Sequence, residues 1–436
     1  LTITADFLSI HALTVKIVPI KYTSTYEDIT YSLSTSTKEQ NRQDIQEALM
    51  KIFPTGAANV VMRSTDLVFT GDLYYDEEWD RLLDKIAITK YSDGSPPSEV
   101  YYGLIPILDE YGNSWWYGGV VGYGYVGPPT YSGPRAAIGL ASGYIEQFNS
   151  SIDGEVTAAH EIGHNLGRLH APCGNPESID PSYPYAGGKI GQFGFSPSNN
   201  QIFSPYNYYD IMGYCQDVWI SDYNYTAMMQ SQLLYGSSLN TLQTQDSLQI
   251  NANIDSSGEL SVQPAYVASA SPLNNAKDGE YSAEFLDADG NVTTRYTLPV
   301  TLALAENFSS RKISAALPMP KSTPAGLRIL KDGNILFEKA FIHQNTLNLP
   351  DQQKPEISTQ ISENTLSISW NLKDTPTMLR YSSDGGKTWT TLEADNITGQ
   401  WHGSVQAFMN RRIIFQIIPA WSLDTITLDQ FFSDTQ

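Results

Sequence analysis

The sequence predicts a multidomain chain of the α+β and β classes, in which one α/β domain is followed by two β-sandwich domains. Three observations support this prediction. A chain of 436 residues is too long for a single core. Strand-like and helix-like segments alternate before about residue 240, and only short strand-like segments follow. We therefore expect domains at residues 1–240, 241–350 and 351–436.

Hydrophobic periodicity predicts the elements of the first domain. In NRQDIQEALMKIF, residues 41–53, the apolar residues Ile45, Leu49 and Ile52 have helical spacing, and Pro54 stops the helix. Alternating β-branched and apolar residues predict strands elsewhere. The remaining expected elements are strands at 13–22, 59–69, 99–108, 115–127 and 136–142, a helix at 77–88, the histidine-bearing helix that follows, and a closing helix at 218–236.

The second half of the chain contains strand-like segments separated by turn signals. Asp-Gly and Gly-Asn pairs recur at hairpin spacing. The segment 349–356, LPDQQKPE, is expected to link two sandwich-sized parts. The motif SSDGGKTW at 382–389 is typical of a single turn-stabilising hairpin. The expected strands lie within 260–269, 281–291, 327–341, 365–370 and 411–421.

Charge and hydropathy exclude some partners. The formal net charge is −21, from 47 acidic and 26 basic residues, and such a surface repels nucleic acid and anionic membranes. No run of about 18 apolar residues occurs, so membrane insertion is not expected. The acidity is more typical of a soluble surface outside the cell than of one specific acidic site.

The two cysteines, Cys173 and Cys215, allow two interpretations. They are either two buried thiols, as in a reducing compartment, or one disulfide, which would close a loop of about 42 residues and contribute about 4 kcal/mol. Their positions beside two other motifs favour the disulfide. That choice predicts export, with a secreted or extracellular location, the cell surface and the periplasm included.

The stretch HEIGHNLGRLH, residues 160–170, holds three of the six histidines. His160 and His164 lie four apart, so a helix presents both rings on one face. Glu161 is offset by about 100° and is expected beside a metal rather than on it. Gly167 can end the helix in a left-handed turn, which lets the chain return and offer His170.

Three imidazoles leave the fourth position of a tetrahedral zinc site for water, which is typical of a catalytic site. A carboxylate beside that water can take its proton. The alternative for any one histidine is a hydrogen-bonded core residue. Zinc is therefore the predicted cofactor, whereas calcium is compatible with the sequence but not indicated by it.

The same stretch resembles the HExxHxxGxxH signature of the metzincin zinc endopeptidases. DIMGY, residues 210–214, resembles the Met-turn of that family, with Met212 packed under the ligands. The resemblance implies that Tyr214, two residues later, reaches the metal or the reaction intermediate, as in astacins and serralysins. Plain packing is the alternative for Tyr214. The likeness follows the element order over about residues 10–236 and is specific only over 157–173 and 209–215.

One departure concerns the residues after His170. Ala171, Pro172 and Cys173 stand where the named branches often carry a characteristic Asp, Glu or Ser, or Pro as in serralysins. Because of this departure, the branch is left unassigned. The sequence is most similar to secreted bacterial reprolysin-like proteases with a cysteine after HAP.

An extended substrate is expected to pair with a sheet edge. The proposed edge is GGVVGYG, residues 118–124, whose glycines permit close backbone approach. The alternative is a flexible loop. The tyrosine-rich loop 183–209 is expected to form the wall of the pocket beyond the scissile bond. The predicted substrate-binding residues are Val120, Val121, Gly122 and Tyr123.

These observations predict a secreted zinc metalloendopeptidase, a hydrolase that acts on protein or peptide substrates with Glu161 as general base. One alternative is a glycan- or cell-surface-binding protein in which the C-terminal domains dominate, through Trp389, Trp401 and Trp421. A second alternative is a metal-binding scaffold without catalysis, against which the presence of Glu161 argues.

Overall fold

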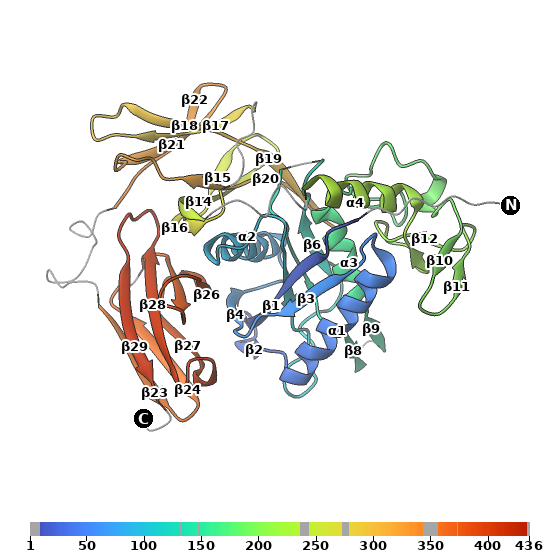
Figure 1. Cartoon of the computed structure of the whole chain (residues 1–436), viewed down its shortest axis with the longest axis horizontal. Helices are drawn as coiled ribbons and strands as arrows, with labels where there is room; N and C mark the ends of the chain where they lie inside the picture. Colours follow the sequence, from blue (N-terminus) through green and yellow to red (C-terminus); the bar gives the residue numbers. More distant parts are fainter. Residues whose placement is uncertain are drawn as a thin grey trace.

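The computed structural model describes residues 9–130, 132–146, 149–235, 244–272, 279–342, 356–372 and 374–433. These residues form mostly β-sheet with few helices, as Figure 1 shows. The expected boundaries near residues 240 and 350 lie outside the described residues, as does the linker 349–356 apart from its last residue. No helix within the described ranges is long and apolar enough to cross a membrane.

A mixed sheet forms the centre of the first half of the chain. Its longest strand, β1 (Leu13–Ser24), pairs in parallel with three later strands. The short strand β2 pairs antiparallel with one end of β1. On the other side of β1, beyond β5, strand β6 pairs antiparallel with β7. The other strands are β2 (Ile29–Tyr31), β3 (Ala58–Met62), β4 (Leu67–Gly71), β5 (Val100–Ile105), β6 (Gly122–Tyr125) and β7 (Ala136–Leu140).

Helices cover both faces of this sheet. In β1, Val15 and Ile17 point toward α1 (Thr35–Ile52) and α3 (Gly154–Asn165), whereas Val18 and Ile20 point toward α2 (Asp76–Ser92). This division follows from the two-residue period of a strand, which sends alternate side chains to opposite faces. Both faces are therefore buried, and α3 is held against the sheet.

Two expected elements differ from those observed. The helix expected at 41–53 begins at Thr35, because the Ser34 side chain accepts a hydrogen bond from the Thr37 N–H and caps it. The strand expected at 59–69 is two strands, β3 and β4, which pair with different halves of β1. Hydrophobic content alone did not locate the break between them.

The long loop after α3 is ordered but contains little regular structure. Its C-terminal end leads into α4 (Asp222–Tyr235), which begins four residues later than expected because residues 218–219 form a short strand. The other elements between β7 and α4 are β8 (Gly143–Ile145), β9 (Ser150–Ile152), the 3₁₀ turn η2 (Ala186–Gly188), β10 (Gly194–Ser196), β11 (Gln201–Phe203), β12 (Tyr209–Asp210) and β13 (Val218–Trp219).

The first β-rich module is joined to the central sheet. Strand β19 (Val300–Ala305) pairs antiparallel with β6, so that one sheet of twelve strands runs through both parts. A second sheet, β18-β17-β21-β22, packs over the module's own core. The module's strands are β14 (Gln245–Ile254), β15 (Leu260–Val262), β16 (Tyr266–Ala270), β17 (Tyr281–Leu286), β18 (Val292–Leu298), β19, β20 (Ser309–Pro318), β21 (Gly326–Lys331) and β22 (Asn334–Ala340).

The C-terminal module is a two-sheet sandwich, drawn in orange to red in Figure 1. It contacts the end of α2, where the Arg380 guanidinium donates to the Ser92 carbonyl at 3.1 Å. Its strands are β23 (Ile357–Ser362), β24 (Thr365–Trp370), β25 (Thr377–Ser382), β26 (Thr390–Asn396), β27 (Gln400–Ser404), β28 (Arg411–Pro419) and β29 (Ile426–Phe432), with the 3₁₀ turn η5 (Val405–Ala407).

Candidate metal centre and cleft

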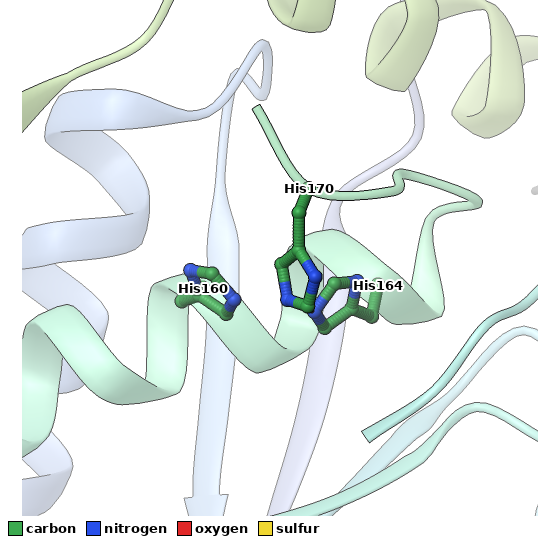
Figure 2. A group of neighbouring side chains, drawn as sticks. All are labelled: His160, His164 and His170. Carbon is green, nitrogen blue, oxygen red and sulfur yellow. The ribbon is translucent and has the colours of Figure 1, made fainter. Parts of the chain in front are cut away.

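Three histidine side chains converge at the end of α3, as Figure 2 shows. His160 and His164 lie one turn apart on the helix, and His170 comes from the segment that follows it. Gly167 has φ +84°, the left-handed conformation that ends the helix and turns the chain back. The three candidate ligand atoms lie within 4.8 Å of one another, and all three residues are buried.

Each ring is oriented by a backbone carbonyl on its other side. The Nδ1 atoms of His160 and His164 lie 2.7 Å from the carbonyls of Ile211 and Arg168. Nδ1 of His170 lies 2.5 Å from the carbonyl of Glu177. Because a neutral imidazole has one ring N–H, donation from Nδ1 leaves Nε2 as an acceptor. All three Nε2 lone pairs therefore face the common centre.

This arrangement fits a divalent metal ion. Burial lowers the pKa of His160 to about 3 and of His170 to about 4, so the rings are neutral, the form in which imidazole binds metals. Nε2 of His164 and of His170 lie 3.1 Å apart although both are acceptors, and buried Nε2 of His160 has no hydrogen-bond partner. A cation between them would satisfy all three atoms, and three nitrogen ligands are typical of zinc.

Glu161 lies beside the three histidines, under strand β6. A Cβ atom at Gly122 would lie 2.4 Å from its Oε1, and one at Gly124 would lie 2.9 Å from its Oε2. Glycine at both positions therefore makes room for this carboxylate. Burial raises the pKa of Glu161 well above its usual range, and the charge of nearby Glu306 raises it further. Its buried Oε2 has no hydrogen-bond partner among the described residues.

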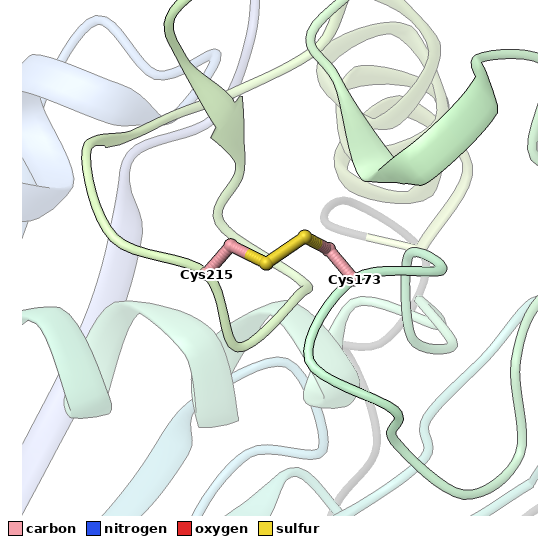
Figure 3. Close-up of a disulfide and its surroundings, with 2 residues drawn as sticks. All are labelled: Cys173 and Cys215. Carbon is pink, nitrogen blue, oxygen red and sulfur yellow. A yellow bond between two sulfur atoms is a disulfide. The ribbon is translucent and has the colours of Figure 1, made fainter.

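The predicted Met-turn lies beneath the site. The Met212 sulfur would be 2.4 Å from a Cβ atom at Gly163, so the missing side chain lets the turn pack directly against α3. The Ala171 N–H donates to the Met212 carbonyl at 2.9 Å. A disulfide joins Cys173 to Cys215, as predicted, and ties the chain after His170 to the turn (Figure 3).

Tyr214 points toward the same centre. Its hydroxyl donates to Nε2 of His170 at 2.6 Å, and its ring stacks on that of His160 with centroids 5.3 Å apart. Burial raises the pKa of Tyr214 far above its usual range, so the phenol keeps its proton. The side chain is thus in contact with two of the three histidines.

The Met-turn is fixed by residues that the sequence analysis missed. The Asp210 carboxylate accepts from the Met212 N–H and from the Asn224 amide, both at 2.8 Å. Arg168, whose carbonyl orients His164, is held by Asn224 and by an ion pair with Asp180. Asp210 is the first residue of the DIMGY motif, but nothing local in the sequence identified Arg168 or Asp180.

A cavity of about 410 Å³ opens beside the three histidines. Its wall includes α3, the segment after the Met-turn, and the turn between β19 and β20. Glu306, on this last turn, lies 136 residues after His170 in the sequence. Nothing in its neighbouring sequence indicates that it belongs to this cavity. The lining contains four carboxylates and no lysine or arginine; its residues are Trp116, Gly119, Val121, Ser151, Ile152, Asp153, Val156, Thr157, His160, Glu161, Ile211, Gly213, Tyr214, Cys215, Gln216, Asp217, Val218 and Glu306.

The predicted substrate edge is partly occupied. Residues 118–121 precede the regular strand, and β6 begins at Gly122. Tyr123 pairs with Ala305 of β19, so it is not available for pairing with another chain. Val121 and Gly119 line the cavity. Of the expected loop 183–209, no residue is among those lining this cavity; that wall is formed by residues 213–218.

The C-terminal tryptophans do not form an exposed surface. Trp401 and Trp421 are buried in the cores of the β modules, and Trp389 lies beside the Arg380 guanidinium. In the hairpin at 382–389, Asp384 accepts from the backbone N–H groups of Lys387 and Thr388 and stabilises the turn. Trp401 and Trp421 are therefore packing residues, whereas Trp389 is half-buried.

Comparisons with known proteins leave the family open. No protein-family model matches the sequence, and no curated protein matches it. A two-domain fibronectin type III segment from chicken tenascin is similar in structure at 12% identity, with a TM-score of 0.16, covering 44% of this chain and 97% of that one. A β-1,2-glucanase from Parabacteroides distasonis matches at 10% identity and TM-score 0.19, over 46% of this chain and 29% of that one. The fibronectin domains FN1–FN3 of chicken CNTN1 match at 9% identity and TM-score 0.14, over 44% and 64%.

Proposed function

We propose that this protein is a zinc-dependent peptidase of the metzincin type that acts outside the cell. The observation that carries the proposal is the convergence of three neutral, buried imidazoles beside an unpaired carboxylate at the wall of an open cavity. A structural zinc site has four protein ligands, whereas the described residues bring three histidines together, and one of them, His160, lines the cavity.

The three histidines and Glu161 have different proposed roles. His160, His164 and His170 would hold the zinc ion, each oriented by a backbone carbonyl behind it. When bound, zinc supplies Lewis acidity and lowers the pKa of water. Glu161 takes the proton of the attacking water and delivers it to the leaving amine, because its side chain adjoins the three histidines and lines the cavity.

Tyr214 can serve as a hydrogen-bond donor to the developing oxyanion, because its proton is retained and its hydroxyl lies at the metal-facing atom of His170. The cavity beside it accepts part of an extended peptide. The disulfide between Cys173 and Cys215 supports a location in an oxidising compartment, since such bonds are rare in the cytosol.

Replacing Glu161 with Gln tests the proposal. The variant is expected to bind zinc with unchanged stoichiometry, because Glu161 is not among the converging ligand atoms. Hydrolysis of peptides should fall by about 10³-fold or more, as expected for loss of the general base. Metal analysis and a peptide-library digest, with and without a chelator, measure the two effects.

A matched control is Glu155→Gln on the same helix, since Glu155 does not line the cavity. This control should retain both zinc and turnover. Near-full turnover by the Glu161 variant would refute the mechanism. A wild-type protein that binds zinc but cleaves no peptide would favour the metal-binding scaffold, and a glycan array with the full chain would test the glycan-binding alternative.

A further inference from the structure

We propose that the Glu306 carboxylate binds the free amino terminus of the substrate, so that the enzyme removes only the first one or two residues of a peptide. This inference rests on the proposed zinc peptidase function and names its substrate class. It depends on the pairing of β19 with β6, on the position of Glu306 at the end of β19, and on the charge of the cavity.

Strand β19 already occupies the end of the edge that a long substrate would need. Leu304 pairs with Gly124, and Ala305 pairs with Tyr123, in antiparallel register. Glu306 follows, and its carboxylate accepts a hydrogen bond from the Val121 N–H at 3.3 Å. The chain then turns away into β20. Since a Cβ atom at Gly122 would contact Glu161, this closed end lies next to the catalytic carboxylate.

The contact between β19 and β6 is built into the fold. The Val126 N–H donates to the Leu302 carbonyl at 2.8 Å, and the Thr301 hydroxyl donates to the Val126 carbonyl at 3.0 Å. Ala303 and Ala305 are buried in the core that lies under α2. Lys312 of β20 is fully buried and forms ion pairs with Asp80 and Asp84 of α2.

Such an interface is not a removable lid. Opening it would expose the β6 backbone groups and leave the Lys312 and Asp84 charges unpaired, and breaking a buried ion pair is strongly destabilising. Substrate must therefore enter the cavity that Gly119, Val121 and Glu306 line.

A peptide in the cavity that continues in the direction of β19 begins beside Glu306, where β19 ends. Its amino terminus then faces the Glu306 carboxylate. A strand in the opposite direction would place its carboxyl terminus there, and two carboxylates would repel each other. The cavity lining adds Asp153, Glu161 and Asp217 and contains no lysine or arginine. Charge therefore selects the orientation that brings an ammonium group to Glu306.

In the hydrolysis itself, one water molecule is added across the amide bond. The carbonyl carbon gains the hydroxyl, the C–N bond breaks, and the leaving nitrogen gains the proton held by Glu161. The substrate ammonium is not consumed. Glu306 is thus a specificity-determining residue that positions the chain, whereas Glu161 exchanges the proton.

Binding is measured first, with the zinc-loaded Glu161→Gln protein, which holds peptide without cleaving it. The probes are an amidated, alanine-rich pentapeptide and its N-acetylated form, compared by calorimetry. Acetylation should weaken binding by about 10- to 100-fold, as expected for loss of a charge-assisted hydrogen bond. Adding Glu306→Gln should abolish the difference between the two peptides. Adding Glu259→Gln, an exposed carboxylate of the same module, should preserve it. Equal binding of both peptides by the protein with Glu306 intact would overturn the proposal.

Cleavage by the wild-type protein separates this inference from the proposed function. Mass spectrometry of peptides with free termini should show products shortened by one or two residues, and acetylated peptides should be cleaved at least 10-fold more slowly. Cleavage of both forms at interior bonds would refute the role of Glu306 and leave the zinc peptidase standing. Discrimination in binding without any cleavage would refute the peptidase and leave the ammonium site standing.

Discussion

The disulfide between Cys173 and Cys215 should raise the thermal stability of the fold around the three histidines. It should not be needed for these side chains to converge. The perturbation is the double variant Cys173→Ser, Cys215→Ser. The two Cα atoms lie 5.7 Å apart and the sequence separation is 42 residues. Backbone hydrogen bonds join the same two segments independently, including that from the Tyr214 N–H to the Cys173 carbonyl at 2.9 Å. The folded geometry should therefore persist when the sulfur atoms are removed.

The expected loss of stability follows from the length of the loop. For a loop of this length, the chain-entropy relation gives about 4 kcal/mol at 25 °C, because the crosslink mainly restricts the unfolded chain. For a unit of 150–250 residues, each kcal/mol corresponds to about 2–4 °C, so the transition should fall by about 8–16 °C. Zinc affinity should change much less, since the carbonyls that orient the three histidines remain in place.

Calorimetry of the wild-type and double-variant proteins, each with zinc and with a chelator, measures both effects. The wild type treated with reductant is the control and should match the variant. Thiol titration of the denatured, unreduced wild type should find no free thiol. An unchanged transition temperature in the variant would refute the entropic argument, and two titratable thiols in the wild type would refute the crosslink itself.

Two further predictions concern the cleft. In Gly122→Ala, the added methyl group would lie 2.4 Å from Glu161 Oε1 and displace it, so hydrolysis should fall by about 10²-fold while zinc stoichiometry is unchanged. Gly56→Ala, where the methyl group meets nothing within 4 Å, is the control, and normal turnover of the Gly122 variant would show that the carboxylate needs no such space. In Tyr214→Phe, kcat should fall by about 10- to 100-fold with KM and zinc binding nearly constant, because the hydroxyl acts on the oxyanion. An unchanged kcat would assign Tyr214 to packing alone.

The metal centre was predictable because its information is local. His160 and His164 lie one helical turn apart, and Gly167 must adopt a left-handed conformation for the chain to return with His170. The helical period and one backbone restriction are sufficient to bring these side chains together. The disulfide was predictable for a similar reason, since each cysteine adjoins a motif that belongs to the same site.

The elements around the site were predictable in kind but less so in extent. Apolar periodicity located α1 and α2, yet it missed the cap at Ser34 and the break between β3 and β4. Those features depend on a side-chain hydrogen bond and on which half of β1 each segment meets. The pairing of β6 with β19 was not predictable, because it joins residues about 180 positions apart and neither strand carries a signal of its partner.

The glycines of β6 have a different explanation from the one that the sequence suggested. The pattern GGVVGYG, residues 118–124, was interpreted as a bare backbone that a substrate can approach, because glycine in a strand often marks such a contact. In the structure, the empty sites at Gly122 and Gly124 face α3 and are filled by the Glu161 side chain. The outer edge of the same strand is filled by β19. Each glycine therefore accommodates the Glu161 carboxylate, and the cavity that remains lies beside Glu306, at the start of the strand.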